Sequence, residues 1–408
     1  MSEPSRDPGS ILTLNRRGEG VTVDGRAVPF ALPGDIAGEP PVSPRAAPIC
    51  RWFGVCGGCA AQHMPGELYA DWKRDAVVAA LDSAGVKARV SALIDAHGAG
   101  RRRATFHARL PSDGGVEVGF MRARAHEIVE IDACPLFAPE LHAAPAVARA
   151  VAQALRGLGK PLDIQITATL GGLDVDLRGS GRLEPAQTRK LIALAESFDL
   201  ARLSNHGVAL IERRPASVAF GEARVVPPAG GFLPATVAGE ETLASRAREA
   251  MKGADRVADL FCGAGAFALR LAQAHPVFAA DNDAAAIAAL RRAAADTAGL
   301  RGVTAQARDL FRQPLIAAEL GRFDAVLFDP PRAGAQAQTR EIAQSGVRLV
   351  VAISCNAETF ARDAATLVEG GYACETVTPL DQFRFSPHVE IFAVFRRGAL
   401  KRRRSVLG

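Results

Sequence analysis

The second half of the chain repeats a short apolar run, rich in β-branched residues, followed by an alanine-rich segment with helical spacing. Five such runs occur, at residues 256–260, 276–280, 303–307, 323–328 and 349–354. Apolar runs of this length between helices are typical of parallel strands that are buried on both faces. The alternation therefore predicts an α/β fold with a doubly wound, Rossmann-like parallel sheet, which two further runs at 372–377 and 389–395 would complete.

The fifth run ends abruptly in a thiol and two polar groups. Leu349–Ser354 is followed directly by Cys355 and Asn356. Open α/β sheets bind ligands at the carboxyl ends of their strands, so this position places Cys355 where a reaction can take place. The alternative is that Cys355 is one more buried thiol, because free cysteine is often buried.

A glycine-containing turn follows the first run, in the sequence DLFCGAGAF at residues 259–267. Gly263 and Gly265 permit a ligand to approach backbone N–H groups closely. Asp281 ends the next run, about 20 residues further on, where an acidic residue usually binds ribose hydroxyls. The third glycine of a dinucleotide fingerprint is absent, since residue 268 is alanine. S-adenosylmethionine (SAM) has no pyrophosphate, so it fits this loop better than NAD does.

Two further carboxylates lie at strand ends. Asp329 follows the fourth run and precedes Pro330 and Pro331, which stiffen the loop. It suits a hydrogen bond to a base or cofactor, although an ordinary turn would look the same. Glu390 lies within the otherwise apolar last run. A partly buried carboxylate has a raised pKa and can act as a general base, whereas a glutamate at a sheet edge needs no function.

The thiol, the nucleoside-binding loop and the carboxylate together define one mechanism. The C5 atom of uracil is too weak a nucleophile to attack a methyl sulfonium directly. Addition of the Cys355 thiolate to C6 turns C5 into an enolate-like nucleophile, which takes the methyl group. A base must then remove the C5 proton so that the thiolate can leave, and Glu390 is the candidate.

Three of the seven cysteines are close together, in the pattern CxxxxxCxxC formed by Cys50, Cys56 and Cys59. An odd number of cysteines without a secretory signal argues against a disulfide framework. Two glycines before Cys59 would allow the thiolates to converge on a zinc ion or an iron–sulfur cluster. The fourth ligand would be Cys134, which precedes a proline, or His63.

Composition divides the 408 residues into three parts. Residues 1–45 contain short β-type runs and turn signals, which predict a small β-barrel-like segment. Residues 46–236 alternate strand and helix patterns, with an amphipathic helix at about 69–84, and form an expected central α+β domain. Residues 237–408 form the domain with the doubly wound sheet. No run is long enough to span a bilayer, so we expect a cytoplasmic monomer without a membrane partner.

The net charge of +5 gathers in two basic runs, Arg101–Arg103 and Lys401–Arg404. Such runs suit the phosphates of a nucleic acid. Each run is also compatible with a solvated face or a chain end.

These motifs, in this order and over most of the chain, resemble the SAM-dependent RNA uracil-5 methyltransferases, and in particular the iron–sulfur branch that makes 5-methyluridine in 23S rRNA. The resemblance implies catalysis by Cys355 and Glu390, and an N-terminal segment similar to a shortened RNA-binding TRAM domain. It implies a [4Fe–4S] cluster held by Cys50, Cys56, Cys59 and Cys134. It also implies contacts to SAM or the base from Phe261, Gly263, Gly265, Ala266, Asp281, Asp309 and Asp329.

Three positions depart from the family pattern. Ala357 replaces a usual proline after the nucleophile, Pro234 replaces a glutamine that contacts SAM, and Ala266 replaces a common asparagine. Methylation of tRNA uridine, methylation of cytosine C5, and an RNA-binding or assembly protein that has lost catalysis are the alternatives. The cysteine motif argues against tRNA, and the position of Glu390 argues against cytosine. We expect RNA as the partner, with rRNA before tRNA.

Overall fold

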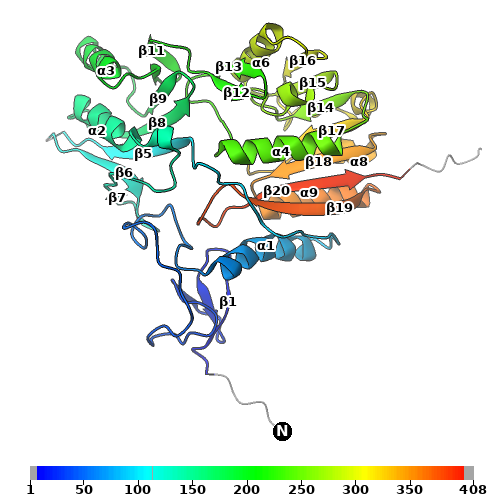
Figure 1. Ribbon diagram of the computed structural model, residues 1–408, viewed down its shortest axis with the longest axis horizontal. Helices are drawn as coiled ribbons and strands as arrows, with labels where there is room; N and C mark the ends of the chain where they lie inside the picture. The colour runs from blue at the N-terminus through cyan, green and yellow to red at the C-terminus, as the bar shows by residue number, and fades with distance from the viewer. Residues whose placement is uncertain (1–6, 113, 399–408) are drawn as a thin grey trace, which may run out of the picture.

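The computed structural model describes residues 7–112 and 114–398, so the basic run Lys401–Arg404 lies outside the described residues. Figure 1 shows a small β unit at one end of the molecule, a central domain on one side and the larger C-terminal sheet on the other. Within the described residues, no helix is both long enough and apolar enough to cross a membrane.

The C-terminal domain is built on an eight-stranded sheet in the order β16-β15-β14-β17-β18-β20-β19-β4. Seven of the eight strands run in one direction, and β20 runs antiparallel to them between β18 and β19. The strands are β14 (Val257–Leu260), β15 (Val277–Asp281), β16 (Val303–Ala307), β17 (Ala325–Phe328), β18 (Leu349–Ser354), β19 (Ala373–Asp381), β20 (Glu390–Arg396) and β4 (Ile94–Asp95). The predicted doubly wound sheet is confirmed.

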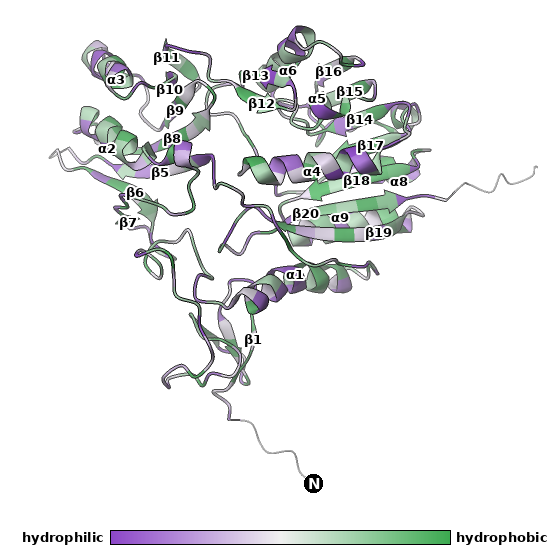
Figure 2. Cartoon of the chain, viewed as in Figure 1, coloured by the Kyte–Doolittle hydropathy of each residue, from purple (hydrophilic) through white to green (hydrophobic). Residues whose placement is uncertain are grey.

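Helices cover both faces of this sheet, because its central strands are apolar on both sides. Successive residues of β17 and β18 alternate between two separate groups of buried side chains, one on each face. Figure 2 shows these strands as hydrophobic throughout. The helices of this domain are α4 (Val237–Ala250), α5 (Ala268–Leu271), α6 (Ala284–Asp296), α7 (Ala317–Leu320), α8 (Gln336–Gln344) and α9 (Ala357–Glu369).

The central domain has a seven-stranded sheet in the order β11-β10-β9-β8-β5-β6-β7, with helices against one face. Its strands are β5 (Arg103–Arg109), β6 (Glu117–Met121), β7 (Ile128–Val129), β8 (Pro161–Thr169), β9 (Gly172–Arg178), β10 (Arg202–Asn205) and β11 (Val208–Glu212). Its helical segments are η1 (Pro139–Leu141), α2 (Ala144–Ala154) and α3 (Pro185–Ser197). A hairpin of β12 (Val218–Phe220) and β13 (Ala223–Val225) leads to the C-terminal domain.

The N-terminal unit is an antiparallel sheet of β1 (Ile11–Leu14), β2 (Gly20–Thr22) and β3 (Ala27–Val28). The chain then enters α1 (Gly66–Ser83), whose apolar face packs on the C-terminal sheet beside α9. The Trp72 indole donates a hydrogen bond to the backbone oxygen of Asn15 at 2.8 Å, which ties the small sheet to α1. The predicted central segment 46–236 therefore sends residues 66–95, including β4, to the C-terminal sheet.

Leu327 tests how much the buried strand β17 contributes to stability, because its side chain is fully buried. Leu327→Ala is expected to lower the free energy of unfolding by about 2–5 kcal/mol, since the cavity left between packed strands cannot collapse. Leu170→Ala removes the same atoms from a side chain that is 58% exposed and should change stability by less than about 0.5 kcal/mol. Chemical denaturation of both variants measures the difference, and equal losses would contradict the assigned core.

Candidate active site and cysteine cavity

The antiparallel pairing of β18 with β20 brings Cys355 next to Glu390. The ladder pairs Leu349 with Arg396 at one end and Ser354 with Ile391 at the other. The next pair outward is Cys355 and Glu390. The thiol is half-buried and the carboxyl is buried, so the two predicted catalytic side chains lie at one edge of the sheet.

The charges around Cys355 determine the protonation of its thiol. Burial, together with the negative charges of Glu390 and Asp329, raises the pKa of Cys355 to about 11. The nearby guanidinium of Arg332 opposes this shift. The free protein therefore holds Cys355 as a thiol, and a base or an added positive charge is needed to form the thiolate.

The two carboxyl groups beside Cys355 hold protons more tightly than ordinary acids do. Burial raises the pKa of Glu390 well above its usual value, the charge of Asp329 adds to this, and a hydrogen bond from the amide of Gln382 opposes it. Burial, together with the charge of Asp281, raises the pKa of Asp329 to about 7. A carboxylate with a raised pKa is a better proton acceptor, as a general base requires.

The glycine turn after β14 has the backbone shape of a ligand-binding loop. Phe261 has a φ of 62°, a conformation that bulky residues rarely adopt and that occurs at functional sites. The N–H of Gly263 donates to a carboxylate oxygen of Asp281 at 2.9 Å, which joins the loop to the end of β15. A Cβ on Gly263 would meet no atom within 4 Å, so open space lies beside this turn.

The remaining predicted cofactor residues surround this loop. The ring of Phe261 lies 5.4 Å from that of Phe311, and Asp309 accepts the backbone N–H of Phe311 at 3.0 Å. A Cβ on Gly265 would come within 2.4 Å of Leu290, so the turn has room only for glycine there. The backbone oxygen of Ala266 accepts a hydrogen bond from Arg270 at 2.8 Å. The assignment of these side chains to SAM stays a prediction.

Four side chains near this site were not predicted from the sequence. Asp259 is fully buried beneath the glycine turn and neither carboxylate oxygen has a hydrogen-bond partner. Gln382 donates to Glu390, and Arg332 bonds to the ring nitrogen of His388 at 2.9 Å. Burial, with Arg332 beside it, lowers the pKa of His388 to about 4, so the ring is neutral and accepts. In the sequence, Arg332 lies three residues after Asp329, His388 lies two residues before Glu390, and Asp259 opens the DLFCGAGAF turn, so nearness to these predicted residues could have indicated them. Gln382 carries no such signal.

Two of the departures from the family pattern can be placed in the structure. Ala357 is the first residue of α9, and the side chain of Asn356 caps that helix by accepting the N–H of Glu358 at 3.0 Å. The helix therefore begins directly after Cys355 without a proline. The backbone oxygen of Pro234 accepts a hydrogen bond from Arg102 at 2.9 Å.

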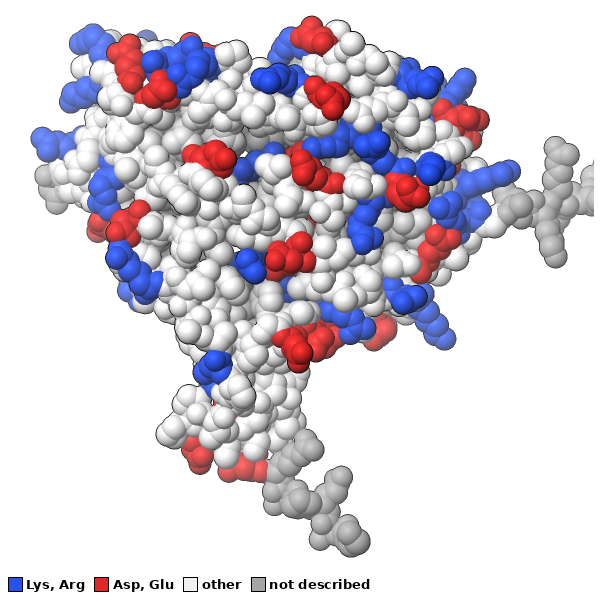
Figure 3. Space-filling view, in the orientation of Figure 1, with Lys and Arg blue, Asp and Glu red and all other residues white. Residues whose placement is uncertain are grey.

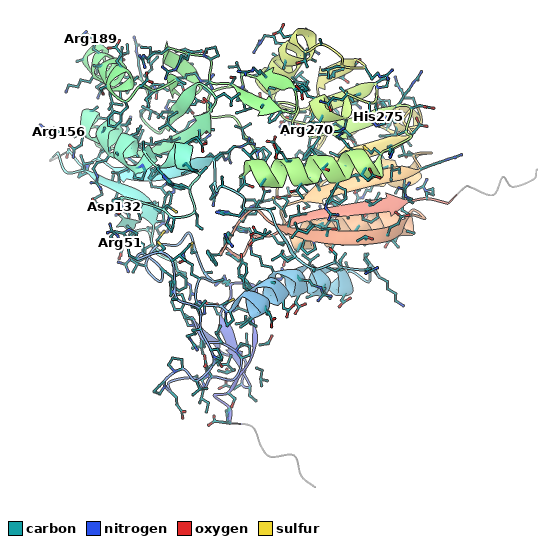
Figure 4. All side chains as sticks on the ribbon, in the orientation of Figure 1. Arg51, Asp132, Arg156, Arg189, Arg270 and His275 are labelled. Carbon is teal, nitrogen blue, oxygen red and sulfur yellow. The ribbon has the colours of Figure 1, made fainter. Side chains whose placement is uncertain are left out.

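A second hollow lies in the central domain, and all four predicted ligand cysteines line it. The cavity measures about 450 Å³, and Cys50, Cys56, Cys59 and Cys134 are on its wall. Burial raises the pKa of Cys59 to about 12 and that of Cys134 to about 11, and the neighbouring thiols add to both shifts. An ion pair of Arg51 with Asp132 joins the two segments that carry these cysteines (Figure 4).

The other proposed fourth ligand, His63, lies elsewhere. Its ring packs between Phe30 and Phe53 with centroid distances of 5.5 and 5.6 Å, and it does not line the cysteine cavity. Both ring nitrogens are buried without a partner, and burial lowers the pKa of His63 to about 4. Among the residues that the structure describes, no three His, Cys, Asp or Glu side chains are arranged to hold a single metal ion.

The side chains of the basic run Arg101–Arg103 make contacts inside the protein and do not form a solvated face. Arg102 forms a buried ion pair with Glu240, and the Arg103 guanidinium lies 4.8 Å from the ring of Phe232. Arg101 and Arg103 line the cysteine cavity. On the face seen in Figure 3, positive and negative side chains are otherwise interspersed.

Comparison with protein families gives a match over residues 241–397 to the family described as tRNA (uracil-5-)-methyltransferase. An uncharacterized RNA methyltransferase of Brucella suis is 44% identical over 405 residues, which cover 95% of this chain and 97% of the relative. The 23S rRNA (uracil(1939)-C(5))-methyltransferase RlmD of Salmonella typhi is 31% identical, over 86% of this chain and 82% of the relative.

A solved structure with a similar fold is the tRNA (uracil-54, C5)-methyltransferase of Pyrococcus abyssi, determined in complex with S-adenosyl-L-homocysteine. It superposes with a TM-score of 0.70 over 95% of this chain and 99% of the other, at 22% sequence identity. At this identity the likeness establishes the fold.

The Cys355 thiol should titrate with a raised pKa of about 11. Its alkylation rate with iodoacetamide, followed by mass spectrometry of the Cys355 peptide, is expected to rise about tenfold per pH unit up to about pH 10, because only the thiolate reacts. Arg332→Met should raise the pKa of the thiol, since a nearby positive charge is lost, and Glu390→Gln should lower it. A rate that levels off near pH 8 would contradict this description of the site.

Proposed function

The chain belongs to the RNA uracil-5 methyltransferase family, and we propose that it methylates C5 of uridine in 23S rRNA through a covalent bond between Cys355 and uracil C6. The observation that carries this proposal is the pairing of the Cys355 thiol with the buried Glu390 carboxyl at the sheet edge that also holds the glycine turn. The 31% identical relative that acts on 23S rRNA supports this choice of RNA.

SAM, when bound, supplies the methyl group as an electrophile. The residues of this chain that would hold it are Phe261 and Gly263 in the turn, with the carboxylates of Asp281 and Asp309 at neighbouring strand ends. The open space beside Gly263 and the Asp281 carboxylate, which accepts the N–H of Gly263, fit a polar ligand at this turn. Asp329, which follows the last residue of β17, would hydrogen-bond the cofactor or the uracil ring.

In the first chemical step, Cys355 adds to C6 of the uracil. Its thiol gives its proton to a neighbouring carboxylate or to water. The thiolate then attacks C6 of the uracil, so a C6–S bond forms and the electron pair of the C5–C6 double bond moves toward C5 and the C4 carbonyl. C5 then attacks the methyl group that SAM would supply, so that the C5–methyl bond forms while the bond from that methyl group to the sulfonium sulfur breaks and its electron pair stays on sulfur, which becomes a neutral thioether. Arg332 assists the deprotonation, because its positive charge lowers the pKa of the thiol.

In the last chemical step, Glu390 removes the C5 proton. Its carboxylate removes the C5 proton from the methylated adduct, the C5–C6 double bond forms again, and the C6–S bond breaks to release the thiolate. The raised pKa of Glu390 favours its acceptance of this proton. Gln382 donates a hydrogen bond to Glu390 and fixes the direction of the carboxyl group.

Methylation of tRNA uridine is the second candidate. The family whose model matches residues 241–397 is described by its action on tRNA, and the similar solved structure is a tRNA enzyme. The same residues would perform the same chemistry on either RNA, so only the substrate differs.

The proposal predicts a missing modification in cells from which the gene has been deleted. 5-Methyluridine should disappear from one position of 23S rRNA, wild-type protein should restore it, and the Cys355→Ala variant should not. Mapping of 5-methyluridine in both rRNA and tRNA by mass spectrometry makes the measurement. Loss from tRNA alone would establish the second candidate, and restoration by Cys355→Ala would show that another residue is the nucleophile.

We further propose that the cysteine cavity holds a [4Fe–4S] cluster, with Cys50, Cys56, Cys59 and Cys134 as its ligands. What supports this is that the four thiols line one cavity and that a backbone N–H, that of Gly58, points to the Cys56 sulfur at 3.4 Å. A single zinc ion would need sulfurs about 3.8 Å apart, given Zn–S bonds of about 2.3 Å. A cluster is wider, and it suits four separate ligands on a cavity wall.

Anaerobically purified protein should contain about four irons per chain and absorb as an iron–sulfur protein does. Cys134→Ser should lose most of this iron, because one of the four ligands is gone. Cys374→Ser is the matched control, since Cys374 is a half-buried cysteine outside the cavity, and it should keep the wild-type iron content. Stoichiometric zinc without iron, or equal iron in both variants, would refute the cluster.

A further inference from the structure

The loop between β19 and β20, residues 382–389, connects directly to the proposed general base. It contains Gln382, which donates to Glu390, and His388, which accepts from Arg332. The loop has no helix or strand of its own. The direction of the Glu390 carboxyl therefore depends on contacts that other parts of the chain make with this loop.

Those contacts come from α1, far away in the sequence. Lys73 is 2% exposed, and its ammonium group donates to the Asp381 carboxylate and to the backbone oxygens of Phe383 and His388, the last two at 3.0 and 2.8 Å. An ammonium group has three N–H donors, so all of them are used on the loop and the residue before it.

A second side chain of α1, that of Tyr69, hydrogen-bonds to the same loop. The Tyr69 hydroxyl donates to Asp381 at 2.5 Å and accepts the backbone N–H of Phe385 at 2.8 Å. Tyr69 and Lys73 are four residues apart and hence on one face of the helix. Together they fix the loop at its start, in its middle and two residues before Glu390.

Burial of a charge is costly, so the ion pair of Lys73 with Asp381 adds little to the stability of the fold. Its main effect is to fix the position of the loop. Burial lowers the pKa of Lys73, and the Asp381 carboxylate beside it acts in the opposite direction. A buried ion pair is weak support for stability but fixes the geometry of the groups it joins. Apolar side chains of α1 already attach this helix to the C-terminal sheet.

We propose that Lys73 is a positioning residue for proton removal, and that it acts by holding the 382–389 loop so that Glu390 reaches the C5 proton of the methylated uracil. The inference rests on the proposed function, because it assigns Lys73 to the last step of that reaction. Lys73 itself touches no reacting atom. Its effect passes through the loop to Gln382 and Glu390.

This role predicts which step fails when Lys73 is changed. Thiol addition and methyl transfer need Cys355 and the glycine turn, and Lys73 donates a hydrogen bond to neither. The loop that Lys73 holds does reach Cys355 indirectly, because His388 accepts from Arg332 and Arg332 lowers the pKa of the thiol, so a parallel loss of turnover and adduct would indicate an effect on thiol addition instead. Removal of the C5 proton needs Glu390 within hydrogen-bond distance, and a displacement of about 1 Å can slow such a step about a hundredfold. The methylated adduct, still bound to Cys355 through C6, should therefore accumulate.

The experiment uses the full-length protein, substrate RNA and SAM with a radiolabelled methyl group. For Lys73→Met, steady-state turnover is expected to fall between about tenfold and a hundredfold. The fraction of protein recovered as a methylated covalent complex with RNA on a denaturing gel should rise above that of wild type. KM for SAM should stay within about twofold, because the cofactor residues are untouched.

Three further variants make the outcome decisive. Lys87→Met removes an exposed lysine outside the network and should behave as wild type. Lys73→Arg keeps the charge and should restore part of the turnover. Glu390→Gln should trap the methylated adduct outright. Its failure to do so would overturn the proposed base itself, and the role of Lys73 in placing that base would be overturned with it.

The inference is overturned if Glu390→Gln traps the adduct while Lys73→Met either turns over at the wild-type rate or loses turnover and adduct in parallel. Thermal melting of each variant shows whether it is folded. Should Lys73→Met be unfolded, Tyr69→Phe carries the test, since it removes one hydroxyl from the same network. It is expected to accumulate the adduct, and an unchanged adduct fraction would refute the proposal.

Discussion

The register between β18 and β20 is the constraint on which the rest of the site depends. Both catalytic candidates are fixed by it, because Cys355 follows the last residue of one strand and Glu390 begins the other. A shift of one residue would turn every side chain of a strand to the opposite face, and the alternating cores on both faces prevent such a shift. Packing far from the reacting atoms thus determines the distance between thiol and carboxyl.

Four carboxyl groups lie close together at the carboxyl edge of the sheet, and their mutual repulsion and burial favour the protonated forms. Asp259, Asp281, Asp329 and Glu390 influence one another, and burial raises the pKa values of three of them. The positive charges nearby are few and act at defined places: Arg332 beside Cys355, and Lys73 behind the loop that ends at Glu390. A site of this kind favours proton transfer between neighbours, which the proposed reaction requires at its start and at its end.

The central domain is joined to the glycine turn through buried ions. Glu240 of α4 pairs with Arg102, at the entry to β5, and with Arg270, whose guanidinium also donates to the backbone oxygen of Ala266. Arg101, one residue before Arg102, lines the cysteine cavity. The cavity and the turn are therefore connected by a short series of contacts, and removal of one partner would leave a buried charge unpaired.

The strands of the C-terminal sheet, the glycine turn and the residue types of the site could be predicted from the sequence alone, because continuous apolar runs and motif spacing are local properties. The sequence did not determine that α1 packs on the C-terminal sheet, or that Lys73 reaches Asp381 across 308 residues. The family resemblance favoured Cys134 over His63 as the fourth ligand, and the tertiary structure adds that Cys134 lines the cavity whereas His63 does not. These outcomes belong to the tertiary structure, since strand order, register and helix docking depend on contacts between segments that no local pattern records.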